Sequence, residues 1–89
     1  MPTISYFFGI YVLMYLMDNR RHHAPHIHVS YQDDDAVIAI ETGDILDGRL
    51  PPKQLRLVQA WVEIHRDELM DDWALAIAGE KPFRIAPLQ

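Results

Sequence analysis

Four of the five histidines in this chain lie within seven consecutive positions, directly after two arginines. Imidazole is the side chain whose unperturbed pKa lies nearest neutrality, and it is also the commonest metal ligand. So dense a cluster indicates proton transfer, phosphate contact or metal binding. Its members are Arg20, Arg21, His22, His23, His26 and His28.

His26 and His28 are two residues apart in a segment that alternates apolar and polar residues, which predicts a strand. Their imidazoles therefore project to the same face. Because Ile27 and Val29 should enter the core, we expect the pair to face away from it, toward solvent or a groove. Two adjacent histidines can act as general acid and general base on a phosphodiester.

The residues expected around this pair suit a nucleic-acid substrate. Arginines form paired hydrogen bonds with phosphate oxygens, and tyrosines stack on bases or donate to phosphates. We expect Tyr15 beside the catalytic pair and Glu41 as a carboxylate that could orient an imidazole. The residues assigned to substrate binding are Tyr11, Arg20, Arg21, His22, His23 and Arg49.

Two other interpretations of the histidines stay open. A His-x-His strand with a carboxylate elsewhere can build an open divalent-metal site, with His26 and His28 as ligands. No Asp or Glu stands at a diagnostic interval, so our first expectation is that the chain needs no metal and no other cofactor. The third interpretation is that these are exposed histidines of a loop and an edge strand, without chemistry.

Short segments rich in aromatic and β-branched residues predict an antiparallel meander of about four strands. The first is Ile4–Met17, which Gly9 could divide into two. His26–Tyr31, Ala36–Glu41 and Ile45–Leu50 follow. In the first segment the even-numbered side chains are uniformly apolar and should meet the core, namely Phe8, Ile10, Val12, Met14 and Leu16.

After Pro51 the apolar residues recur every three or four positions up to Gly79, which predicts a helix packed on one face of the sheet. At about 1.5 Å per residue it would be roughly 40 Å long, more than so small a sheet needs. We therefore expect a kink near His65–Asp67, or two helices. His65 should be a core or interface histidine with a hydrogen-bonded partner. The segment Pro82–Gln89 could dock as an edge through Phe83, Ile85 and Leu88.

Composition predicts one globular α+β domain over residues 1–89, with 49% hydrophobic and 24% charged residues. The absence of cysteine excludes disulfides and thiolate metal sites. A formal net charge of −5 argues against non-specific nucleic-acid binding, although a local basic site stays open. The apolar Ile4–Met17 is too short to span a membrane, so we expect a cytoplasmic protein with no membrane contact. Burial at this size is modest, so a homodimer or a protein partner could add to it.

Several short motifs in order give the chain a resemblance to the bacterial domain-of-unknown-function family 4160. They include the opening Met-Pro-Thr-Ile-Ser-Tyr-Phe-Phe-Gly-Ile, then Met14-Tyr15, Pro25-His26-Ile27-His28-Val29, Ile40-Glu41-Thr42-Gly43, and Trp61 with His65 and Trp73. The resemblance marks Tyr15, His26 and His28 as positions of the family pattern. The loop Asp18–Ala24 is longer than the family's Asp-His-x-Pro-Pro run, which leaves open whether His22 or His23 corresponds to the family's loop histidine.

The resemblance also implies a biological setting. Genes of this family often neighbour those of a second small family, domain of unknown function 2442, in arrangements that resemble type II toxin–antitoxin pairs. The family 4160 member is then the toxin. Our leading hypothesis is therefore a toxin that cleaves RNA without a metal through His26, His28 and Tyr15, and that a small antitoxin neutralises. The alternatives are a non-enzymatic protein-binding growth inhibitor and a small divalent-metal protein.

Overall fold

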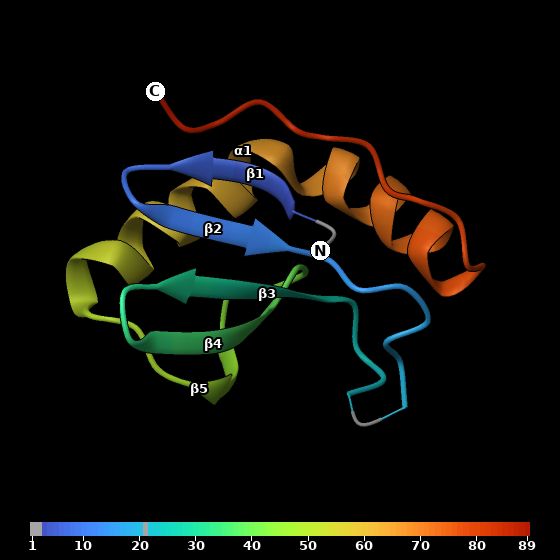
Figure 1. The fold of residues 1–89 in the computed structure, drawn as a ribbon, viewed down its shortest axis with the longest axis horizontal. Coiled ribbons are helices and arrows are strands. Elements are labelled where there is room, and N and C mark those ends of the chain that lie inside the picture. Colours follow the sequence, from blue (N-terminus) through green and yellow to red (C-terminus); the bar gives the residue numbers. More distant parts are fainter. Residues whose placement is uncertain (1–2, 21) are drawn as a thin grey trace.

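Five strands and one long helix make up the computed structural model, which describes residues 3–20 and 22–89. The strands are β1 (Thr3–Phe7), β2 (Ile10–Leu13), β3 (His26–Tyr31), β4 (Asp34–Ala39) and β5 (Ile45–Gly48), and the helix is α1 (Pro52–Ile77). Each strand pairs antiparallel with the next, in the order β1-β2-β3-β4-β5. Figure 1 shows this meander with α1 lying across one face. The predicted α+β class is confirmed, with five strands in place of about four.

The extra strand arises at Gly9, where the first apolar segment turns back on itself. Phe8 and Gly9 both have positive φ, of 50° and 79°, as in the two-residue turns that suit hairpins. The possible division at Gly9 is confirmed, but the prediction that the whole even-numbered face meets the core is wrong at its two ends. Phe8 is 60% exposed because it forms the turn, and Leu16 is exposed because it lies beyond β2. The even-numbered residues between them are buried, namely Ile10, Val12 and Met14.

The hydrophobic core lies between α1 and the sheet face that α1 covers. Ile27 of β3 and Ile38 of β4 are fully buried there and are paired across the two strands. From the helix, Trp61 and Leu69 are also fully buried. Since an antiparallel strand sends alternate residues to opposite faces, the residues between these core positions lie on the face that α1 does not cover. We call this second face the outer face.

Helix α1 bends at His65, whose φ of −110° and ψ of 20° are not helical. The kink predicted near His65–Asp67 is therefore confirmed. The His65 side chain is largely buried; its Nδ1 lies 2.6 Å from Glu68 Oε1 and its ring 5.4 Å from that of Trp61. This agrees with the expected partnered histidine. No helix within the described residues is both long enough and apolar enough to cross a membrane.

The segment after α1 runs back along β1, as Figure 1 shows in red. Its backbone is held at two points: Phe83 N donates to Asp72 Oδ1 at 2.9 Å, and Ile85 N donates to Ile4 O at 2.8 Å. The Ile85 side chain is buried, whereas Phe83 is 73% exposed. The predicted docking at the edge is therefore right for Ile85 and wrong for the Phe83 side chain.

Candidate functional site

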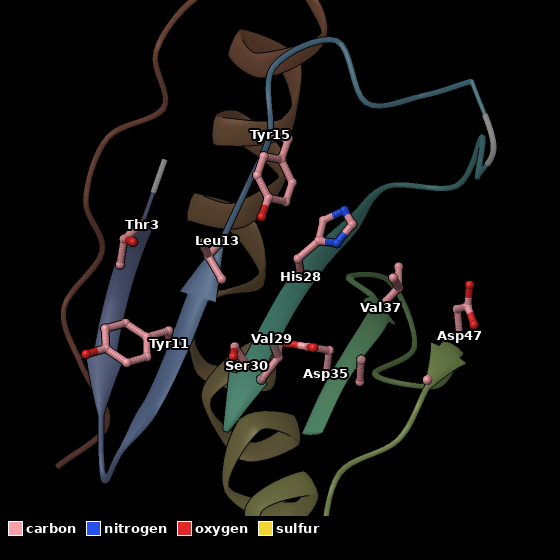
Figure 2. Close-up of a pocket in the computed structure, with 12 residues that line it drawn as sticks. Thr3, Tyr11, Leu13, Tyr15, His28, Val29, Ser30, Asp35, Val37 and Asp47 are labelled. Carbon is pink, nitrogen blue, oxygen red and sulfur yellow. The ribbon is translucent and has the colours of Figure 1, made fainter. Parts of the chain in front are cut away.

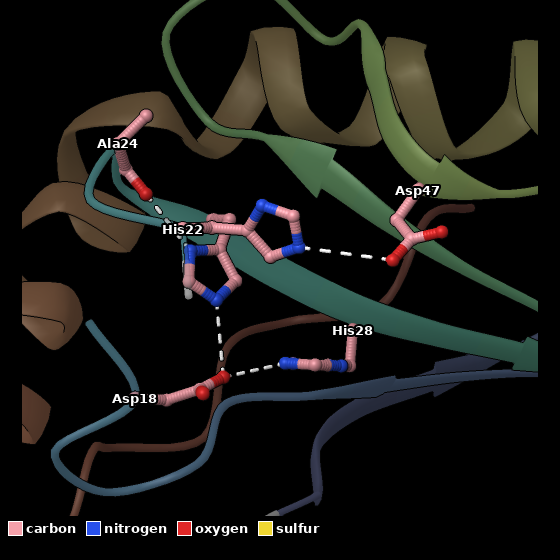
Figure 3. A network of polar contacts seen from close by, with 6 residues as sticks. Asp18, His22, Ala24, His28 and Asp47 are labelled. Atoms are coloured by element: carbon pink, nitrogen blue, oxygen red, sulfur yellow. Dashed lines mark hydrogen bonds and ion pairs between the residues drawn. The ribbon is translucent and has the colours of Figure 1, made fainter. Parts of the chain in front are cut away.

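Asp18 joins the two strand histidines into one polar cluster (Figure 3). Its Oδ2 atom lies 3.0 Å from His26 Nε2 and 2.5 Å from His28 Nε2. His26 and His28 are held by β3, and Asp18 lies in the loop that connects β2 to β3. The pairing of Leu13 with His28 forces this loop to return beside the strand it left, which brings the carboxylate to the imidazoles.

Two opposing effects act on the acidity of Asp18. Partial burial raises its pKa, but the hydrogen bonds and the charge of His28 and His26 together lower it below the ordinary value of 3.8. The carboxylate is therefore ionised at neutral pH. A fixed negative charge thus lies between two imidazole rings whose centroids are 5.4 Å apart.

His26 is buried, with only 1% of its surface exposed. Its Nδ1 donates to the Ala24 carbonyl at 2.8 Å, and its ring packs 4.8 Å from that of Trp73. The prediction that both histidines face solvent or a groove is therefore wrong for His26 and right for His28. The reason is that the β2–β3 loop and Trp73 cover the first residue of β3, so strand alternation alone does not determine its exposure.

His28 borders a cavity of about 690 Å³ on the outer face (Figure 2). Tyr15 packs edge-on against the imidazole, with ring centroids 4.7 Å apart and an interplanar angle of 80°. Tyr11 also lines the cavity, as expected if the first strand pairs in register. The other lining residues are Thr3, Leu13, Val29, Ser30, Asp35, Ala36, Val37, Asp47 and Gly48.

Of the two loop histidines, His22 is the one that approaches the cluster. Its ring lies 5.6 Å from that of His26, and its Nε2 lies 3.8 Å from Asp47 Oδ2. His23 is exposed, and no contact between it and the cluster is found among the described residues. Of the two loop histidines, His22 is therefore the one that lies at the site.

Two of the arginines expected to bind phosphate, Arg20 and Arg49, do not line this cavity. Arg49 points into solvent, with 84% of its side chain exposed and its Nε 3.5 Å from Asp34 Oδ1. Arg20 is exposed, and Arg21 lies outside the described residues. Within the part of the chain that the structure describes, the cavity wall contains the carboxylates of Asp35 and Asp47 but no lysine or arginine.

The residue that sequence reasoning missed is Asp18. Glu41, the carboxylate considered for orienting an imidazole, is exposed, and the hydrogen bonds to both histidines come from Asp18. One signal could have found it: Asp18 is the first charged residue after the apolar segment, in a loop that ends at His26. A loop between paired antiparallel strands must bring its two ends close together.

The fold and the cluster together define a small α+β protein with a histidine–carboxylate site at one end of an open sheet face. A family model, the domain of unknown function DUF4160, matches residues 9–74. The chain therefore belongs to the DUF4160 family, as its motifs suggested. No curated protein and no solved structure matches it.

Proposed function

We propose that this chain is the toxin member of a two-protein pair and acts through the outer face of its sheet. The observation that carries the proposal is the position of His28. Its side chain is 29% exposed, it is held by Asp18, and it borders a cavity on the face that α1 leaves uncovered. The gene arrangement implied by the family resemblance supports the same proposal.

The proposed reaction is cleavage of an RNA phosphodiester at the end of the cavity where His28 and Tyr15 meet. His28 is the histidine that can contact the substrate, and Tyr15 lies close enough to stack on a base or donate to a phosphate. Buried His26 then acts as a positioning residue, because it contacts His28 through Asp18. This function requires a cytoplasmic location, where the RNA is found.

A partner that covers the outer face would block this site. The rings of Tyr6 and Tyr11 are in contact there, with centroids 4.5 Å apart and planes tilted by 42°, and about half of each residue is exposed. Exposed tyrosines suit protein interfaces because they combine a large apolar ring with a hydroxyl. The same pair, together with exposed Phe8, supports a second candidate function, in which the chain inhibits growth by binding a protein target without catalysis.

Inducible expression in bacteria tests the proposal, with the chain alone and together with the product of the adjacent gene. We expect growth inhibition and RNA cleavage by the chain alone, and relief by its partner. His28→Ala should abolish both effects. His65→Gln, which changes a histidine on α1, should abolish neither.

The same experiment separates the two candidate functions. Unchanged growth on expression of soluble, folded protein contradicts the toxin proposal. Growth inhibition that persists in folded His28→Ala, with RNA intact, contradicts catalysis and supports protein binding. In that case Phe8→Ser and Tyr11→Ser should remove the inhibition, because they alter the exposed aromatic surface.

A further inference from the structure

Asp18, His26 and His28 form a ligand set of the kind that binds divalent transition metals. One possible ligand atom from each residue lies within 4.8 Å of those of the other two. With metal–ligand distances of about 2.0 Å, neighbouring ligands of a tetrahedral ion lie about 3.3 Å apart. Asp18 Oδ2 lies 3.0 Å from His26 Nε2 and 2.5 Å from His28 Nε2, so side-chain movements of less than about 1 Å would open both separations to this value.

The hydrogen bonds of His26 give a second, independent argument. The Ala24 carbonyl can only accept, so His26 Nδ1 must carry a hydrogen. His26 Nε2 then faces the Asp18 carboxylate, 3.0 Å from Oδ2. Two arrangements bring this nitrogen and this oxygen so close: a proton between them, or a metal cation that accepts a lone pair from each.

The contact with Ala24 is also the support that metal-binding histidines usually have. A histidine ligand generally donates its second ring N–H to a carbonyl or carboxylate, which fixes the ring and its tautomer. His26 makes this hydrogen bond at 2.8 Å from a position that is fully buried. Its Nε2 is therefore held in one orientation, toward Asp18 and His28.

The cluster is closed on one side and open on the other. His26 is buried against Trp73, whereas the Asp18 and His28 side chains are 33% and 29% exposed. An ion held by the three residues would keep a coordination position for water or substrate. Three protein ligands with one open position are typical of reactive rather than purely structural zinc sites.

We infer that Asp18 Oδ2, His26 Nε2 and His28 Nε2 bind one divalent transition-metal ion, for which Zn²⁺ is the natural probe. The ion also supplies what the proposed RNA cleavage lacks, namely positive charge beside a cavity lined by Asp35 and Asp47. It replaces the metal-independent pair of free histidines expected from the sequence. Metal binding itself does not depend on the toxin proposal, and the two are measured separately.

The test uses the full chain purified without a histidine tag and dialysed against a chelator. Calorimetric titration with Zn²⁺ should give one ion per chain. Asp18→Asn and His28→Ala should each raise the Kd at least about 100-fold. His65→Gln should leave the Kd within about threefold, because His65 lies on α1 and contacts Glu68. Far-UV circular dichroism checks the fold of each variant, and Asp18→Asn changes no side-chain volume.

Three outcomes would overturn the inference: no stoichiometric Zn²⁺ uptake, uptake that survives in folded Asp18→Asn, or uptake that His65→Gln removes. A Co²⁺-loaded sample adds a spectroscopic readout, because Co²⁺ in a four-coordinate site with two nitrogen ligands and one oxygen ligand from the protein absorbs strongly in the visible. The Asp18→Asn protein should lose that absorption band. Stoichiometric metal binding without RNA cleavage would uphold the site and contradict the proposed activity. Cleavage by metal-free protein would uphold the proposed activity and contradict a role of the ion in it, while the titration alone decides whether the site binds metal.

Discussion

Asp18 and His28 are ten residues apart in the chain, yet Asp18 Oδ2 lies 2.5 Å from His28 Nε2. The same oxygen contacts His26. One carboxylate therefore fixes the loop between β2 and β3 against the beginning of β3. The site and the local stability of this loop consequently depend on the same residue.

Asp18→Asn should lower the free energy of unfolding in the absence of metal by about 1–2 kcal/mol, since hydrogen bonds to a charged group contribute more than neutral ones and partial exposure weakens them. Urea denaturation at pH 7 measures the change. Glu41→Gln is the matched control, because Glu41 is exposed. Equal effects of the two substitutions would contradict the assigned role of Asp18.

The raised pKa of Asp72 should make the stability of the fold depend on pH. Burial raises its pKa above 3.8, the Phe83 backbone N–H partly offsets this, and the charges of Glu68 and Asp71 raise it further. The folded chain therefore holds this proton to a higher pH than the unfolded chain. The ionisation of Asp72 costs stability, and this cost appears as the pH rises from 3.8 through the folded pKa.

Asp72→Asn should remove this cost while keeping an oxygen that accepts from Phe83 N. At pH 7 the variant should have a higher free energy of unfolding than the parent chain. This difference should shrink as the pH falls toward 4. Urea denaturation across this range measures it. Parallel pH profiles for the two proteins would show that Asp72 does not titrate in this way.

Gly48, the last residue of β5, and Gly43, in the connection between β4 and β5, form a matched pair of glycines with positive φ, of 76° and 79°. A Cβ at Gly48 would overlap the Asp35 carbonyl oxygen, whereas at Gly43 its nearest neighbour would be Gln59 Cγ at 3.5 Å. Gly43→Ala should cost about 1–2 kcal/mol and Gly48→Ala more than about 3 kcal/mol. Thermal and urea unfolding compare them. A Gly48→Ala protein as stable as Gly43→Ala would contradict the close β4–β5 approach.

Trp61 connects the core to the segment after α1. Its ring is fully buried, and its Nε1 donates to Ala86 O at 2.8 Å. Trp61→Phe should cost about 2–3 kcal/mol through lost volume and a lost hydrogen bond, and should speed proteolysis after residue 80. Phe83→Ala should cost under about 0.5 kcal/mol, because that side chain is exposed. Similar proteolysis of the two variants would contradict this connection.

Most of the fold could be predicted because strand alternation and the helical period are local signals. Val29 and Ile38 are buried as their alternation indicates, and the excess length of the helix indicated the kink at His65. The burial of His26 could not be predicted, since it depends on Trp73, which is 47 positions away in the chain and belongs to α1. Asp18 was missed for a related reason: the spacing of residues in a sequence does not give the path of a loop.

The backbone bond from Ile85 to Ile4 has a consequence for how the sheet meets other chains. An uncovered edge strand can pair with a strand of another molecule, and natural proteins commonly protect such edges. The segment after α1 covers β1, which leaves β5 as the accessible edge of the described sheet. Any extension of this sheet by a strand from another molecule should therefore begin at Ile45–Gly48, the strand whose Asp47 lies 3.8 Å from His22 of the histidine cluster.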